Sequence, residues 1–562
     1  MRTAGRGLGA IVAILALAAC STISDPPASP DAQPTAPFIV PGTSGVWIVD
    51  GDDWSLPSGV TPAPNSGFFS ESADAATHVD VRSIDVTWGQ LQPVQGGQLD
   101  TTRAGSAEGM TLAPLASQLA DGGPFWMRIF ASGETWAPRW VATACGVKTY
   151  GPDYEGQRHL PIWNECVWSH LLETYRALFV RQGLAADPRL RFVYVPGAFT
   201  WAEFDYETIT SAVDVGDLDF AAYKRWYDHA WTDLVGIFGA NSAKLVFTGE
   251  DYPFGPFGEK ENLLARQAVD AGLGIRTGIT ELSNFHLSEA PAYGSAVQPN
   301  GHLLVDETLP IHDGTRVVAT ENECFTDCGY STRDPYYAVR QANLKALQLR
   351  MNWDYVVPVP SYLRKYAAHW NWTRLSLGKT AATSADAWAD LRDAEDTYWK
   401  DNATGRFADP AAWKSRPFVR NLERWLVQVD VPGSVAHRST ADIHRHVFEK
   451  DNGVAYEGLS TRVAAGDTGF AFDVDPAFAA ASVGIPLLLK VTYLDRGTGA
   501  FSVRYPGGHS AQVRRGDTGR WRTATLALPG LRLDTGNRLR LALAPGAHDL
   551  DVRFVRLVKT RV

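Results

Sequence analysis

Apolar residues between positions 45 and 375 alternate between short runs of strand length and longer stretches with helical spacing. The longer stretches, for example 168–184 and 334–351, repeat their apolar positions every three or four residues. Strands that alternate with helices are typical of a parallel sheet covered by helices. The short runs predict strands at 45–50, 82–88, 125–131, 191–197, 244–251, 274–280, 316–323 and 354–360. Strands and helices in this number and order predict an α/β fold, a (β/α)8 TIM barrel.

The pattern changes towards the C-terminal end of the chain. Residues near 385 to 430 keep helical spacing and predict helices that close the barrel. Beyond Pro432, short alternating runs are separated by Gly, Asp and Pro, which is typical of an all-β, jelly-roll-like sandwich. We therefore expect a barrel domain at 44–430 and a C-terminal β-sandwich at 431–562, with the boundary between about residues 425 and 440.

The first 43 residues have the features of an export signal followed by a tether. Arg2 and Arg6 precede a short apolar segment, and the sequence LAAC at 17–20 matches the lipobox of bacterial lipoproteins. We expect a signal peptide at 1–19 that is removed, so that Cys20 becomes a lipidated first residue. Ordinary secretion with a chance cysteine is the alternative. Residues 20–43 are rich in Pro and Ser and predict a flexible tether. The chain would then be an exported bacterial lipoprotein, periplasmic or on the cell surface, anchored to the membrane only by its lipid.

Net charge argues against a nucleic-acid-binding protein, and the cysteine content is consistent with a disulfide-bonded, exported one. The 52 Lys and Arg against 62 Asp and Glu give a formal net charge of −10, which argues against nucleic acid as a partner. Besides Cys20, the remaining cysteines are even in number in a chain expected to leave the cytoplasm. Local pairing predicts the disulfides Cys145–Cys166 and Cys324–Cys328. A zinc site is the alternative, but neither pair has CxxC spacing.

Acidic residues gather where the predicted strands end, and the active sites of such barrels lie at those C-terminal ends. The acids concerned are Asp50, Asp52, Asp53, Glu203, Glu250, Asp251, Glu281, Glu321 and Glu323. GxSxG, P-loop and HExxH motifs are absent from the sequence, and 19 tryptophans are present. Glycoside hydrolysis uses carboxylates beside aromatic rings, because one acid protonates the leaving oxygen and a second carboxylate attacks or activates water. The sequence therefore predicts a glycosidase.

Two segments resemble known glycosidases. VTWGQLQPVQGGQLD at 86–100 resembles the strand-2 region of family 42 β-galactosidases, and 160–195 resembles the approach to strand 4 in related clan A barrels. The resemblance implies a retaining enzyme with its acid/base after strand 4 and its nucleophile on strand 7. By position, these roles fall on Glu203 and Glu321.

The sequence departs from these families at the predicted acid. Trp201-Ala202-Glu203 stands where the families have a Trp-Gly-Glu-like turn, and the Asn-Glu pair typical of clan A is missing. Glu323 lies two residues beyond Glu321 and is the alternative nucleophile. If the barrel has lost catalysis, the chain would be a non-catalytic carbohydrate-binding or polysaccharide-assembly lipoprotein, and its sandwich could also bind carbohydrate. A polysaccharide lyase is a third reading, with Tyr206 or Tyr252 as the base.

The expected substrate is a poly- or oligosaccharide. Arg128 is expected to hold the nucleophile as an anion through a charge-assisted hydrogen bond, or else to be a buried ion-pair partner. In the lyase reading it would neutralise a uronate. The other residues expected to bind substrate are Glu250, Glu323, Trp88, Trp136, Trp201, Tyr206 and Trp353. Each tryptophan could equally pack the barrel interior.

No cofactor or metal is expected for catalysis. His437, His444 and His446 include an H-x-H pair, but no third ligand follows at a set spacing, so we interpret them as ordinary histidines. Asp473 and Asp475 could hold a structural Ca²⁺ in the sandwich, or they could belong to a turn.

Overall fold

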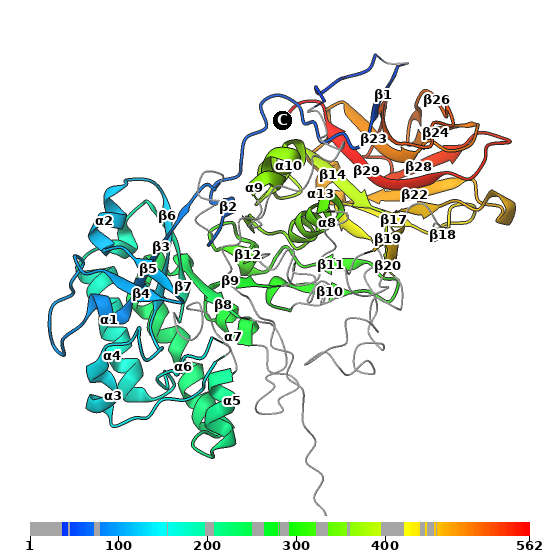
Figure 1. The fold of residues 1–562 in the computed structure, drawn as a ribbon. Coiled ribbons are helices and arrows are strands. Elements are labelled where there is room, and N and C mark those ends of the chain that lie inside the picture. Colours follow the sequence, from blue (N-terminus) through cyan, green and yellow to red (C-terminus); the bar gives the residue numbers. More distant parts are fainter. Residues whose placement is uncertain are drawn as a thin grey trace, which may run out of the picture.

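The computed structural model describes residues 36–42, 45–71, 79–153, 155–196, 207–249, 264–278, 280, 291–321, 335–356, 360–394, 421–435, 437–438, 444–446, 454–456 and 458–562. The chain forms an α/β part with parallel strands, mostly blue to green in Figure 1, and an all-β part that is mostly yellow to red. Helices α8 (Pro335–Gln348) and α10 (Ala367–Ser376) lie between the two parts (Figure 1).

The larger sheet of the α/β part is parallel. Within the described residues it has six strands, in the order β12–β9–β8–β7–β6–β3. Most of its side chains are buried, as expected for parallel strands covered on both faces. The strands are β3 (Arg82–Thr87), β6 (Phe125–Phe130), β7 (Leu190–Val195), β8 (Leu245–Thr248), β9 (Gly274–Thr277) and β12 (Val318–Thr320).

Two more parallel strands, β2 (Gly67–Phe69) and β13 (Trp353–Tyr355), pair with each other. A backbone hydrogen bond links this pair to the larger sheet on each side. The N–H of Asp80, just before β3, donates to the carbonyl of Phe68 at 2.9 Å, and the N–H of Asn352 donates to Val318 in β12 at 3.0 Å.

Side chains from both sheets meet in one apolar interior. The cluster contains Phe69, Val81, Trp126, Phe192, Tyr194, Val246, Val317, Ala319, Trp353 and Tyr355. The parallel strands therefore surround a common core, although among the described residues their hydrogen-bond ladders do not join into one continuous sheet.

The first parallel strand is not the one that the sequence predicted. The run at 45–50 forms β1 (Val46–Asp50), which pairs antiparallel with β27 (Trp521–Ala527) in the all-β part. Its place is taken by β2, whose sequence GFF is too short to give a period-2 signal. As a consequence, Asp50, Asp52 and Asp53 do not lie at the mouth of the parallel sheet.

Helices pack against the outer face of the parallel sheet. Asn164 caps α4 by accepting from the N–H groups of Cys166 and Val167, and Asp219 caps α6 in the same way. The inner faces of these two helices bury Trp168 and Trp226 in the core. The remaining helix bounds are α1 (Trp88–Leu91), α2 (Leu115–Ala120), α3 (Arg139–Cys145), α4 (Glu165–Tyr175), α5 (Glu207–Asp214), α6 (Phe220–Phe238), α7 (Leu264–Asp270), α9 (Pro360–Lys365) and, in the all-β part, α13 (Pro476–Ala480).

The all-β part consists of two antiparallel sheets packed face to face around a shared apolar core. The first sheet has the order β1–β27–β23–β29–β14–β16, with β21 and β18 added at β29, and the second has the order β17–β22–β28–β24–β25, with β26 beside β24. Their strands, besides β1 and β27, are β14 (Asp386–Asp390), β16 (Leu422–Arg424), β17 (Leu426–Val429), β18 (His437–Arg438), β21 (Leu459–Ser460), β22 (Gly469–Val474), β23 (Leu487–Leu494), β24 (Ala500–Tyr505), β25 (Gly508–His509), β26 (Val513–Arg514), β28 (Arg538–Leu543) and β29 (Asp551–Lys559).

The remaining described strands form three small antiparallel sheets. They are β4 (Gly105–Ala107) with β5 (Met110–Leu112), β10 (Ser295–Val297) with β11 (Leu303–Val305), and β20 (Val454–Tyr456) with β15 (Asp393–Ala394) and β19 (His444–His446).

The change from the α/β part to the sandwich comes earlier than the predicted boundary near residue 430. Helices were expected across 385–430, but β14, β16 and β17 are strands of the sandwich sheets. β14 is buried along its whole length, and its two polar residues, Asp386 and Asp390, are paired with Arg556 and Arg340 rather than exposed to solvent. At five residues the strand is too short for its alternation to stand out from the helical spacing predicted around it. The sandwich therefore begins at β14 and also takes β1 from the N-terminal side.

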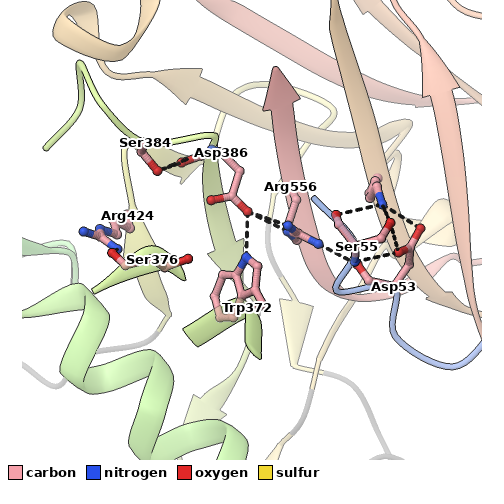
Figure 2. A network of polar contacts seen from close by, with 9 residues as sticks. Asp53, Ser55, Trp372, Ser376, Ser384, Asp386, Arg424 and Arg556 are labelled. Carbon is pink, nitrogen blue, oxygen red and sulfur yellow. Dashed lines mark hydrogen bonds and ion pairs between the residues drawn. The ribbon is translucent and has the colours of Figure 1, made fainter. Parts of the chain in front are cut away.

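A buried polar network joins the two parts, as Figure 2 shows. Asp386 on β14 accepts hydrogen bonds from Trp372 Nε1 at 2.9 Å and from Arg556 Nη2 at 2.6 Å. Arg556 also donates to the backbone carbonyl of Asp53. The Asp53 carboxylate in turn accepts from Lys490 Nζ at 2.7 Å. These contacts explain why Asp53, predicted near an active site, lies at the junction instead.

In the part of the chain that the structure describes, no helix has both the length and the apolar character needed to cross a bilayer. The predicted signal peptide and Cys20 lie outside the described residues.

Candidate active site

Two buried arginines lie on the parallel strands close to their C-terminal ends. Arg128 is on β6 and Arg276 on β9, and their side chains are 0% and 3% exposed. Tyr194 on β7, a member of the interior cluster, touches Arg276: its hydroxyl accepts from Arg276 Nε at 3.1 Å. Charged side chains on buried strands need partners, because an unpaired charge is costly away from water.

Asp85 and Glu71 hold Arg128 in place. Arg128 Nε and Nη2 donate to the two oxygens of Asp85 on β3 at 2.9 and 3.0 Å, and Arg128 Nη1 pairs with Glu71 just after β2. Burial alone would lower the pKa of Arg128. The carboxylates of Asp85 and Glu71 outweigh burial and raise the pKa of this guanidinium well above its ordinary value.

Arg276 connects Glu71 to Glu321. Its Nη2 lies 3.0 Å from Glu71 Oε1, and the same nitrogen pairs with Glu321 Oε2. Glu321 directly follows β12 and is 8% exposed, and its backbone N–H donates to Thr277 in β9 at 2.7 Å. One chain of ion pairs thus runs across the ends of the parallel strands. Its members, in order, are Asp85 (β3), Arg128 (β6), Glu71 (after β2), Arg276 (β9) and Glu321 (after β12). With three carboxylates and two guanidiniums, the chain has one more negative group than positive ones.

The sequence identified two members of this chain and missed three. Glu321 and Arg128 were predicted, but Arg128 binds Asp85 and Glu71, whereas Arg276 is the arginine that pairs with Glu321. Glu71 was missed because its strand was placed at 45–50. Arg276 did carry a signal, since it is a charged residue inside the apolar run GIRTGIT.

Three predicted sugar-stacking tryptophans pack the interior instead. Trp88 and Trp136 are fully buried, and Trp353 is 2% exposed within the interior cluster. Trp88 Nε1 donates to Gln92 at 3.1 Å, and the ring of Trp136 packs edge-on against His159. In this structure the three rings have almost no exposed surface on which a sugar could stack.

Several predicted site residues lie outside the described residues. They are Glu203, Trp201, Tyr206, Glu250, Tyr252, Glu323, Cys324 and Cys328. Their predicted roles therefore stay predictions.

A serine, a histidine and an aspartate lie in line after β6. Ser132 Oγ is 2.9 Å from His159 Nδ1, and His159 Nε2 is 2.6 Å from Asp153 Oδ2. This order of groups resembles a nucleophile, a base and an orienting acid. Ser132 and His159 are fully buried, however, so we interpret the three as hydrogen-bonded residues that hold together the two ends of the segment 131–160, which contains α3.

The predicted disulfide Cys145–Cys166 is confirmed, with Cα atoms 5.6 Å apart. Together with His170, the two cysteines make the one group of three possible metal ligands found in the described part of the chain. In this structure the two sulfurs are bonded to each other, so the pair forms a disulfide rather than two thiolate ligands.

The acids proposed for a sandwich Ca²⁺ site have other contacts. Asp473 accepts from Arg538 Nε at 2.7 Å, and Asp475 caps α13 by accepting from the N–H of Ala477 at 2.8 Å. His437 lies on β18, and His444 and His446 lie on β19.

Comparison with known proteins shows neither a family nor a fold for this chain. No family model matches the chain, and no curated protein matches it. Among solved structures, a GH36 α-galactosidase from Geobacillus stearothermophilus in complex with raffinose aligns with a TM-score of 0.28 and 8% identity, over 81% of this chain and 52% of that one. The chain thus spans about half the length of that enzyme. A likeness this distant carries no argument about the activity of this protein.

Proposed function

We propose that this protein is a retaining glycoside hydrolase with a (β/α)8 barrel, acting on a poly- or oligosaccharide. One observation carries the proposal: Glu321 directly follows a parallel strand, is nearly buried, and pairs with Arg276. In barrels of this kind, catalytic groups come from the C-terminal ends of several strands. Parallel strands around a common interior support the barrel.

Glu321 is the proposed nucleophile. A nucleophilic carboxylate has to be ionised, and a paired guanidinium stabilises the anionic form through charge-assisted hydrogen bonding. Arg276 is itself fixed by Glu71 and Tyr194, so it can orient Glu321 as well as balance its charge. Attack of Glu321 on the anomeric carbon would give a glycosyl-enzyme, which water then hydrolyses.

Glu203 is the proposed acid/base. Its position after the strand β7 and the resemblance to clan A barrels support this role. It would protonate the leaving oxygen and then, as a carboxylate, activate water. Retention requires the carboxyl groups of Glu203 and Glu321 to lie about 5–5.5 Å apart.

Kinetics of two variants test these roles. The purified protein is screened on bacterial and plant polysaccharides and on aryl glycosides, with detection of new reducing ends. Glu321→Ala should lose hydrolysis on all substrates, and azide should restore it with an inverted product. In Glu203→Ala the rate of hydrolysis should fall about 10²–10⁴-fold on natural glycosides, but much less on glycosides with good leaving groups, which need little protonation. The control is Glu165→Ala on α4, whose side chain is 68% exposed.

Two outcomes would contradict the proposal. If Glu321→Ala hydrolysed glycosides at the wild-type rate, Glu321 could not be the nucleophile. Saturable sugar binding by the wild-type protein with no hydrolysis across the panel would favour the alternative, a non-catalytic carbohydrate-binding or polysaccharide-assembly protein.

We also propose export as a lipoprotein anchored through Cys20. The lipobox at 17–20 supports this, as does the disulfide Cys145–Cys166, because disulfides persist in oxidising compartments. A Cys20→Ser variant that stayed in the membrane fraction would contradict it.

A further inference from the structure

Glu71 lies between the two buried arginines at the ends of the parallel strands, and each of its carboxylate oxygens contacts one of them. Its Oε2 pairs with Arg128 Nη1, and its Oε1 lies 3.0 Å from Arg276 Nη2. Arg276 Nη2 also pairs with Glu321 Oε2, so one nitrogen serves two carboxylates. The side chain of Glu71 is 6% exposed, against 11% for Glu321. Glu71 is thus the more deeply buried of the two acids that share Arg276.

The charge of Glu71 is not needed to balance the two arginines. Asp85 holds Arg128 through two hydrogen bonds of 2.9 and 3.0 Å, the strong forked geometry for a guanidinium and a carboxylate. Glu321 pairs with Arg276. Without the carboxylate of Glu71, the described members of the chain of ion pairs would form two neutral pairs. Burial of a further carboxylate is costly, because the group loses its hydration, and this cost points to a role in the chemistry of its neighbours rather than in the fold.

Glu71 weakens the stabilisation of the Glu321 anion by Arg276. A carboxylate at hydrogen-bond distance offsets part of the positive charge of the guanidinium, and Glu71 is also a like charge beside Glu321. A less stabilised anion is a better nucleophile and a poorer leaving group. In a retaining mechanism Glu321 acts as both, because it attacks in the first step and departs in the second.

We infer that Glu71 is a positioning residue that, acting through Arg276, favours the attack of Glu321 on the sugar over its departure. The inference rests on the proposed function, because it takes Glu321 as the nucleophile. In the first step a Glu321 oxygen bonds to the anomeric carbon while the bond to the protonated leaving oxygen breaks. In the second step water attacks this carbon, and the Glu321 oxygen departs with the bonding electrons. Glu71 sets the balance between the rates of these two steps.

The test measures the two steps separately with a 2-deoxy-2-fluoro glycoside that carries a good leaving group. The rate at which the full-length protein becomes labelled reports the attack of Glu321, and the rate at which the purified labelled protein loses the sugar reports its departure. In Glu71→Gln, which removes the charge and keeps the shape, labelling should be about threefold slower and loss of the sugar about threefold faster. The acidic limb of the pH profile of labelling should move by about one pH unit to lower pH, because Arg276 then stabilises the Glu321 anion more strongly.

Two further variants separate this role from a structural one. Tyr194→Phe removes an uncharged contact to Arg276, made by the hydroxyl 3.1 Å from Nε, and should change both rates in the same direction. Glu71→Asp keeps the negative charge and should keep the ratio of the two rates close to that of wild type.

Two results would overturn the inference alone, given a wild-type protein labelled on Glu321. One is a Glu71→Gln protein in which both rates fall together or in which their ratio equals that of wild type. The other is a Glu71→Gln protein that does not fold, measured by circular dichroism, because two neutral pairs would then not suffice for the fold. A wild-type protein without a label on Glu321 would instead contradict the proposed function, and the inference with it.

Discussion

Arg276 shares its guanidinium among Glu71, Glu321 and the hydroxyl of Tyr194. Buried ion pairs of this kind are poor sources of stability, because desolvation offsets most of their attraction and apolar replacements are often neutral or stabilising. We therefore interpret the chain of ion pairs as a device that fixes the position and charge of Glu321 rather than as a support for the fold.

Asp354 on β13 is a second buried acid, and it affects stability rather than the proposed chemistry. It is 2% exposed and lies in register with Phe68, which packs against Trp370. One of its oxygens has no hydrogen-bond partner, and burial raises its pKa from 3.8 to about 7. The folded state therefore keeps a proton that the unfolded state releases near pH 4.

The free energy of unfolding should depend on pH, because the pKa of Asp354 is higher in the folded state than in the unfolded state. A raised pKa in the folded state gives stability that is fully present below pH 4 and is lost as the pH rises towards about 7. Over that window Asp354 should contribute a slope of about −1.4 kcal/mol per pH unit to the free energy of unfolding. Asp354→Asn should remove this slope in urea titrations at several pH values. Asp121→Asn, at an exposed position, should keep the wild-type slope; identical slopes in wild type and Asp354→Asn would refute the assignment.

The sequence predicted candidate residues better than it predicted their partners. Glu321 and Arg128 could be found because acids and a cation at the ends of apolar strands stand out. The pairing of Arg276 with Glu321 and the bridging role of Glu71 depend on which strands are neighbours, and that is decided by the packing of segments distant in the sequence. The predicted tryptophans illustrate the same point. Residue type alone does not distinguish a ring packed in the core from a ring that stacks on a sugar, and burial in the structure places Trp88, Trp136 and Trp353 in the core.

At the scale of elements, the parallel strands from β3 onwards were predicted close to their observed positions. β1 was assigned to the wrong part of the molecule, because an apolar run specifies a strand but not its partner, whereas β14 was predicted as part of a helix. β1 pairs with β27, more than 470 residues away in sequence, for example Val46 with Leu526. Local periodicity contains no information about such a pairing.

The disulfide between Cys145 and Cys166 connects the end of α3 to the start of α4 across a sequence separation of 21. The loop that it closes carries Asp153 and His159. A cross-link over a loop of this size restricts the unfolded chain, and its loss should cost about 3 kcal/mol. We expect Cys145→Ser/Cys166→Ser to unfold at lower urea concentration than wild type. Variants are preferable to a reductant here, since a reductant would also break the predicted disulfide Cys324–Cys328 if it forms. Equal urea midpoints would show that the cross-link does not stabilise the fold.

At the scale of the whole molecule, the junction around Asp386 couples the α/β part to the sandwich (Figure 2). Asp386 and Arg556 are 2% and 1% exposed, and Trp372 from α10 completes the contact. Arg556→Met would leave the Asp386 carboxylate buried without its guanidinium, which should cost about 3–5 kcal/mol.

The matched variant for this junction is Asp386→Asn/Arg556→Met, which removes both charges and should cost clearly less than Arg556→Met alone. Calorimetry should show one unfolding transition for wild type, because the two parts share this buried contact. If Arg556→Met lowered the free energy of unfolding by less than about 1 kcal/mol, this ion pair would contribute no more than an exposed surface pair does, and the proposed coupling would be contradicted.

The proposed role of Glu321 as the nucleophile requires a covalent bond between its carboxylate and the sugar, and trapping this intermediate tests the role most directly. A 2-deoxy-2-fluoro glycoside with a good leaving group slows both steps by destabilising the oxocarbenium-like transition state, so a glycosyl-enzyme accumulates. A panel of such glycosides is incubated with the protein, and peptides are mapped by mass spectrometry. We predict one added fluorosugar, located on Glu321, and none in Glu321→Gln. A label on another carboxylate, or hydrolysis of natural substrate with inversion and no label, would contradict the account.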